Sequence, residues 1–92
     1  MNRIVFLNGK YIKENEAKIS IFDRGLLFAD SVYEVTAVLD NKLIDFPAHI
    51  KRLDNSLKEL EIKNNFTDEF LLKMHKELVN KNKFNDKEGL IY

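Results

Sequence analysis

The sequence predicts an α+β fold in which an antiparallel-rich sheet of hairpins packs against two helices. Two turn signals, Asn8-Gly9 and Asp40-Asn41, each separate short runs of strand-forming residues, a pattern typical of β-hairpins. Two stretches with helical apolar spacing follow Pro47. Because one hairpin alone is marginal in water, we expect three or more strands with an apolar face covered by the helices.

The first hairpin is predicted to join Ile4–Leu7 to Lys10–Lys13. Asn8-Gly9 is the preferred pair for a two-residue type I′ turn, because both positions need a positive φ. The stretch Phe22–Gly25 then mixes charged and large apolar side chains around a glycine. It suits a loop or a single helical turn, which Asp23 and Arg24 are expected to hold through local hydrogen bonds.

The strongest strand signal runs over Ser31–Leu39, which is rich in β-branched residues and contains neither glycine nor proline. Alternation places one set of side chains on one face and the other set opposite: Tyr33, Val35, Ala37 and Leu39 against Val32, Glu34, Thr36 and Val38. Both faces are mostly apolar, so this strand is predicted to lie centrally in the sheet. After Asp40-Asn41, a partner strand is expected over Lys42–Asp45.

Two helices are predicted in the second half. Pro47 suits a first helical turn, and an apolar stripe follows over Pro47–Glu61: Ile50, Leu53, Leu57 and Leu60. The second helix is expected to start after an N-cap at Thr67 and to end near Asn80, with a second apolar stripe: Phe70, Leu71, Met74, Leu78 and Val79.

Residues Gly89–Tyr92 read as the beginning of a further strand, and no polar tail follows them. Chain ends are usually polar and frayed. We therefore expect that the 92 residues are part of a longer protein, or that this strand pairs with another chain.

Fifteen basic and fifteen acidic residues cancel, and the lysines are interleaved with acidic residues. This balance argues against binding to nucleic acid or to a membrane surface through charge. No apolar run approaches the ~20 residues that span a bilayer. The absence of cysteine excludes disulfides and thiol nucleophiles and fits a cytoplasmic location. His49 and His75 are too far apart to indicate a metal site, and each is expected to be an ordinary helix histidine.

Several short blocks occur in a recognisable order: Leu7–Lys10, Phe22–Phe28, Val32–Val35, His49–Leu53, Ser56-Leu57 and Gly89–Tyr92. Together they resemble the small N-terminal domain of the class IV (fold-type IV) aminotransferases, which use pyridoxal 5′-phosphate (PLP). The resemblance covers nearly the whole chain and is greatest to the D-amino acid aminotransferases, including those acting on D-alanine. Ala29 and Ser31 depart from the pattern, because the family usually has glycines there.

The resemblance implies that residues 1–92 are the N-terminal small domain of a PLP-dependent transaminase that uses amino acids and 2-oxo acids. The family's Schiff-base lysine belongs to a C-terminal domain that this chain lacks, so no catalytic residue is assigned and the 92 residues alone are expected to be inactive. The complete enzyme is expected to be a homodimer.

Three residues match family positions. The resemblance assigns Arg52 to the PLP phosphate, and guanidinium geometry suits phosphate recognition. It places Tyr33 on the substrate side of the cofactor, and Val35 on the same face of the strand. The alternative for Arg52 is a solvated helix arginine paired with an acidic neighbour, and for Tyr33 and Val35 it is ordinary strand core. His49, three residues before Arg52, is a further candidate for fixing that arginine.

Other functions remain open from the sequence. Among enzymes of the same fold, 4-amino-4-deoxychorismate lyase is the second candidate activity, and branched-chain aminotransferase is the third. A different class is a non-catalytic α+β interaction module, whose last strand would add to the sheet of a partner.

Overall fold

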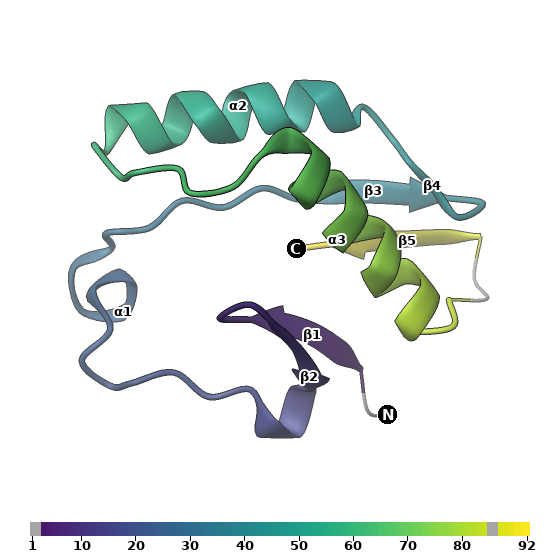
Figure 1. Ribbon diagram of the computed structural model, residues 1–92, viewed down its shortest axis with the longest axis horizontal. Coiled ribbons are helices and arrows are strands. Elements are labelled where there is room, and N and C mark those ends of the chain that lie inside the picture. The colour runs from purple at the N-terminus through teal and green to yellow at the C-terminus, as the bar shows by residue number, and fades with distance from the viewer. Residues whose placement is uncertain (1–2, 85–86) are drawn as a thin grey trace.

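The computed structural model describes residues 3–84 and 87–92, which form an α+β fold as predicted. The strands are divided between two small antiparallel sheets (Figure 1). One pairs β1 (Ile4–Leu7) with β2 (Lys10–Lys13), and the other has the order β4-β3-β5. The two long helices, α2 (Phe46–Glu59) and α3 (Asp68–Lys81), pack beside these sheets.

The predicted first hairpin is confirmed. Leu7 lies opposite Lys10, and the two turn residues have the positive φ values that a type I′ turn requires, 51° at Asn8 and 83° at Gly9. Phe6 packs edge-on against Phe70 of α3, with ring centroids 5.9 Å apart. A short 3-10 turn, η1 (Glu14–Glu16), follows the hairpin.

The predicted turn at Phe22–Gly25 is a short helix, α1 (Arg24–Phe28). The Asp23 carboxylate accepts hydrogen bonds from the backbone N–H groups of Gly25 and Leu26, so it caps this helix. Arg24 Nε lies 3.0 Å from Asp30 Oδ2, which confirms the expected local bonds. Ala29 ends the helix at φ 55°, a left-handed conformation that a glycine adopts without strain.

The prediction of one long strand over Ser31–Leu39 is wrong in extent, because only β3 (Thr36–Leu39) is paired with other strands. Its register places Thr36 opposite Ile91 of β5 (Glu88–Ile91), and within the described residues no strand lies opposite residues 31–35. The predicted alternation holds within β3, where Thr36 and Val38 are each 2% exposed. Its central position, between β4 and β5, is confirmed.

The strand predicted over Lys42–Asp45 is also shorter, and β4 comprises Lys42–Leu43. Asp45 adopts a left-handed conformation at φ 54°, which turns the chain out of the sheet and into α2. The turn signal before it is correct, since Asp40 and Asn41 both have positive φ.

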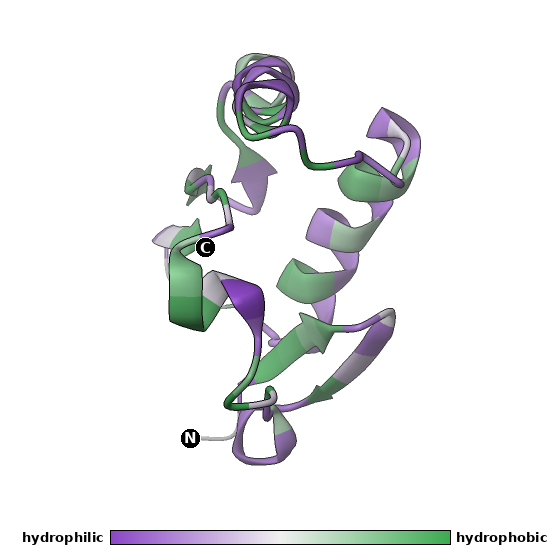
Figure 2. Cartoon of the chain, turned by 90° about the vertical axis from the view of Figure 1, so that its left-hand side faces the viewer, coloured by the Kyte–Doolittle hydropathy of each residue, from purple (hydrophilic) through white to green (hydrophobic). Residues whose placement is uncertain are grey.

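Both predicted helices are confirmed to within two residues at their ends. Thr67 is the N-cap of α3, and its Oγ1 accepts a hydrogen bond of 3.0 Å from the Phe70 N–H. Green hydrophobic and purple hydrophilic segments alternate along α3 in Figure 2, as expected of an amphipathic helix. None of the helices among the described residues has the length and apolar character needed to cross a bilayer.

The buried core lies where α2 meets α3. Phe46 and Ile50 of α2 pack with Leu71 of α3, and each is at most 9% exposed. Partly buried apolar side chains surround this cluster: Leu43, Leu53, Leu72 and Met74. The cluster holds α2 in place beside the segment that leads into β3 (Figure 1).

Candidate functional site

Three polar side chains meet between α2 and the extended segment before β3. The Glu34 carboxylate accepts two hydrogen bonds from Arg52, 2.7 Å from Nε to Oε2 and 2.8 Å from Nη2 to Oε1. Nδ1 of His49 lies 2.8 Å from the same Oε1. His49 and Arg52 are three residues apart on α2, so both side chains project from one side of the helix toward Glu34.

The ion pair between Glu34 and Arg52 shifts the pKa of both side chains. The hydrogen bonds from Arg52 lower the pKa of Glu34 to about 2, with His49 adding to the effect and partial burial opposing it. The Glu34 carboxylate in turn raises the pKa of Arg52. Glu34 is therefore ionised at neutral pH, and an ionised carboxylate only accepts hydrogen bonds, so His49 carries a proton on Nδ1.

A small open hollow of about 320 Å³ lies next to this cluster, and its lining comprises Tyr33, Glu34, Val35 and Arg52. The three site residues predicted from the sequence are thus brought together in one place. Tyr33 is 69% exposed, and its ring stacks on the ring of Tyr92 with centroids 5.7 Å apart. The arginine side chain is 67% exposed, whereas that of Glu34 is only 14% exposed.

Glu34 is the functional candidate that the sequence reasoning missed, although it belongs to the recognised block Val32–Val35. Nothing in the sequence alone separates Glu34 from an ordinary strand residue, and only its contacts with His49 and Arg52 identify it. His49, which the sequence offered as a candidate for fixing Arg52, contacts Glu34, and Glu34 in turn contacts Arg52.

His75 takes no part in this site. Its Nδ1 lies 2.7 Å from the backbone oxygen of Leu71, and its ring packs edge-on against Phe46. Burial lowers the pKa of His75, as expected of a histidine with a packing role. Among the described residues, no three His, Cys, Asp or Glu side chains come together in a way that could hold a metal ion.

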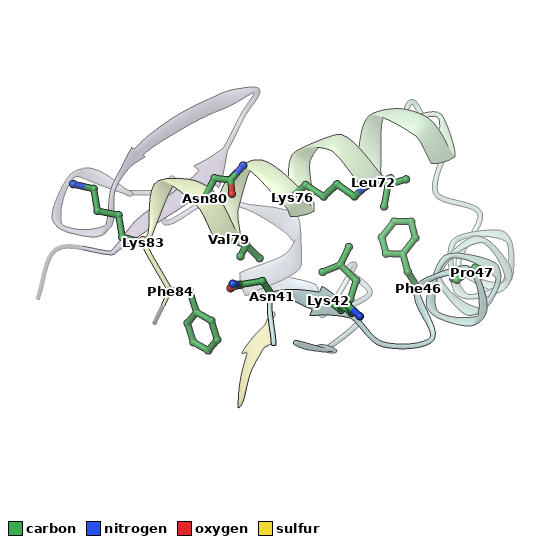
Figure 3. Close-up of a pocket in the computed structure, with 11 residues that line it drawn as sticks. Asn41, Lys42, Phe46, Pro47, Leu72, Lys76, Val79, Asn80, Lys83 and Phe84 are labelled. Atoms are coloured by element: carbon green, nitrogen blue, oxygen red, sulfur yellow. The ribbon is translucent and has the colours of Figure 1, made fainter. Parts of the chain in front are cut away.

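A larger hollow of about 730 Å³ lies on another part of the molecule (Figure 3). It lies between the Asp40-Asn41 turn, the first residues of α2, and one side of α3. Its lining includes Lys42, Lys76 and Lys83. None of the predicted site residues lines it. The smaller hollow beside Arg52 therefore remains the candidate site.

An α+β domain that presents an anchored arginine beside a tyrosine in an open hollow is suited to bind an anionic ligand. Residues 31–91 match the family model described as "Amino-transferase class IV". The chain belongs to this family.

Among curated relatives, a D-alanine aminotransferase of Staphylococcus haemolyticus is 39% identical over 96% of this chain. A putative branched-chain-amino-acid aminotransferase of Methanocaldococcus jannaschii is 37% identical over 89% of it. The chain spans 30% and 28% of the length of these two proteins.

Two solved structures share the fold at 27% sequence identity. The branched-chain aminotransferase of Thermoproteus uzoniensis, solved with norvaline, matches 94% of this chain with a TM-score of 0.85. The T.th. branched-chain amino acid aminotransferase, solved with N-(5′-phosphopyridoxyl)-L-glutamate, matches 91% with a TM-score of 0.83. This chain covers 30% of each of those chains.

Proposed function

We propose that residues 1–92 form the N-terminal small domain of a PLP-dependent transaminase that transfers the amino group of a D-amino acid such as D-alanine to a 2-oxo acid. The family membership and the 39% identity to a D-alanine aminotransferase support this assignment. In the proposal, the Schiff-base lysine lies on a further domain, and the complete enzyme is a cytoplasmic homodimer.

The observation that carries the proposal is the position of Arg52. Its guanidinium is held on one edge by Glu34, and the side chain lines the hollow and is largely exposed. A fixed guanidinium whose other N–H groups contact none of the described residues fits a phosphate, which it binds through charge-assisted hydrogen bonds. The residues present therefore suit the phosphate group of PLP.

Tyr33 and Val35 would form the substrate side of the same hollow. A phenol hydroxyl at Tyr33 can donate a hydrogen bond to a substrate carboxylate, and Val35 adds an apolar wall. When bound, PLP supplies the electron sink for the reaction. The role of the residues in this chain is to bind and orient the cofactor and the substrate.

The proposal is tested on the complete protein by measuring PLP dissociation from the wild type, Arg52→Ala and Arg52→Lys. We expect Arg52→Ala to weaken PLP binding by about 10-fold or more, because it removes charge-assisted hydrogen bonds to the phosphate. Arg52→Lys should restore only part of the affinity, since an ammonium lacks the planar fork.

Arg3→Ala is the matched control, because Arg3 also pairs with a glutamate, Glu14, at 2.7 Å but does not line the hollow. It should leave PLP binding unchanged. Equal PLP affinity of the wild type and Arg52→Ala, at equal melting temperatures, would remove the phosphate role from Arg52.

Branched-chain amino acids are the second candidate substrates, because both solved neighbours are branched-chain aminotransferases. Assays with D-alanine and with L-valine, each with a 2-oxo acid acceptor, separate the two. Turnover of L-valine without turnover of D-alanine would replace the first candidate with the second.

A further inference from the structure

The Glu34 carboxylate occupies one defined edge of the Arg52 guanidinium. It binds Nε and Nη2, the side-on pair of donors, at 2.7 and 2.8 Å. A guanidinium has five N–H groups, so within residues 3–84 and 87–92 both N–H groups of Nη1 and one of Nη2 have no hydrogen-bond partner. One N–H of Nη1 and the remaining N–H of Nη2 form the end-on edge of the group, and Arg52 reaches the hollow with most of its side chain exposed.

We infer that Glu34 is the positioning residue of the phosphate site: it locks Arg52 so that the end-on edge, Nη1 and Nη2, binds the cofactor phosphate. This inference rests on the proposed function, because it assumes that the hollow receives PLP. His49 completes the arrangement by donating its Nδ1 proton to Oε1 of Glu34. A carboxylate that is 14% exposed is thereby held from two sides.

Positioning by Glu34 matters because ordering a long side chain costs conformational entropy. A free arginine samples many rotamers, and ordering it on binding an anion opposes binding through lost conformational entropy. A guanidinium that is already fixed by two parallel hydrogen bonds has lost most of that freedom before the ligand arrives. Glu34 therefore favours phosphate binding although its own charge repels a phosphate.

The two effects of Glu34 have opposite signs, which makes the inference testable. If Glu34 were only a negative charge near the site, Glu34→Gln would remove a repulsion and tighten phosphate binding. If Glu34 positions Arg52, the same change weakens binding, because the neutral amide offers a single acceptor oxygen and its NH₂ group opposes the donors of Arg52 and His49.

The experiment uses the complete protein without cofactor and measures dissociation constants for PLP and for pyridoxal, which has no phosphate. We expect Glu34→Gln to weaken PLP binding by about 10-fold and to change pyridoxal binding by less than about twofold. In the double variant Glu34→Gln/Arg52→Ala, PLP binding should be no weaker than in Arg52→Ala alone, because Glu34 acts through Arg52.

Glu14→Gln is the matched control, since it makes the same carboxylate-to-amide change in another Arg–Glu pair, with Arg3, outside the hollow. It should leave both constants unchanged. His49→Ala provides a second variant if Glu34→Gln does not fold, and it should weaken PLP binding to a lesser extent while sparing pyridoxal.

Unchanged or tighter PLP binding in Glu34→Gln would overturn the inference and leave the proposed function standing. An equal loss for PLP and pyridoxal would also overturn it, since it would indicate a general distortion of the site. A wild-type protein that binds PLP no better than pyridoxal would instead contradict the proposed function, and the inference with it.

Discussion

The side-chain amide of Asn82 pairs with the backbone of Ile4 in the manner of a neighbouring strand. Its Oδ1 accepts a hydrogen bond of 2.8 Å from the Ile4 N–H, and its Nδ2 donates one of 3.0 Å to the Ile4 carbonyl oxygen. Asn82 caps the C-terminal end of α3, so this contact ties the separate β1–β2 sheet to that helix.

Asn82→Ala should lower the free energy of unfolding by about 1–2 kcal/mol, because two backbone groups of Ile4 lose their partner. Thermal or urea unfolding measures the change, and hydrogen exchange at the Ile4 amide should accelerate. Asn80→Ala is the control, since Asn80 is exposed near the end of the same helix. Equal stability of Asn82→Ala and Asn80→Ala would show that the hairpin does not depend on this contact.

The Glu34 carboxyl should titrate with a midpoint near pH 2 in the folded protein, against an ordinary value of 4.5. Its folded-state pKa is depressed, so the stabilisation from the ion pair is complete above about pH 4.5 and is lost as the pH falls toward 2. Carbon NMR of the side-chain carboxyl measures the midpoint directly.

The same ion pair predicts a pH-dependent effect of Glu34→Gln on stability. At pH 7 the variant should be less stable by about 1 kcal/mol, since Arg52 is largely exposed and water screens the pair. The difference should shrink as the pH is lowered through 4 and 3. A carboxyl midpoint near 4.5, or a difference independent of pH, would contradict the structure of the cluster.

Gly89 lies on β5 against the outer end of the Phe84 ring. A Cβ at this position would lie 2.4 Å from Cζ of Phe84, so any side chain must displace the ring. Gly89→Ala should destabilise the protein by about 1–2 kcal/mol, as overpacking does. Calorimetry measures the effect. The double variant Phe84→Ala/Gly89→Ala should lose less stability than the sum of the losses in the two single variants.

The control for Gly89→Ala is Leu90→Ala on the same strand, because Leu90 is 73% exposed. It should change stability by less than about 0.5 kcal/mol. Strict additivity of the Phe84 and Gly89 variants would show that ring and glycine are not in contact.

The proposed function predicts that Tyr33→Phe raises the KM for the amino acid substrate about 10-fold, because Tyr33 would no longer donate a hydrogen bond to the substrate carboxylate. The ring stays on Tyr92, so the fold and PLP binding should be unaffected. Tyr11→Phe on β2 is the control, since Tyr11 does not line the hollow. An unchanged KM in steady-state kinetics would remove the substrate role from Tyr33.

Local signals predicted most of the elements. Asn8-Gly9, Thr67 and Pro47 act on backbone groups within a few residues, and the turn, the cap and the helix start all lie where the sequence places them. The extent of the strand before Thr36 could not be predicted in this way. Residues 31–35 have strong strand propensity, but a strand also needs a partner at the right register, and propensity carries no information about that.

The candidate site was predicted in part. Arg52, Tyr33 and Val35 were found from a family resemblance, and the structure brings them to one hollow, while their roles stay predictions. Glu34 was not found, because a glutamate between two apolar residues of a strand looks like an ordinary solvent-facing side chain. Only its contacts with α2 distinguish it.

The sequence by itself determined the α+β class, the hairpin turns and the two amphipathic helices, because each depends on periodicity and capping among near neighbours. The tertiary structure alone decided that the strands divide into two sheets and that Glu34 joins Arg52 and His49. Those features join residues 15 and 18 positions apart or more, and they depend on the packing of α2 against α3 beside the segment that leads into β3.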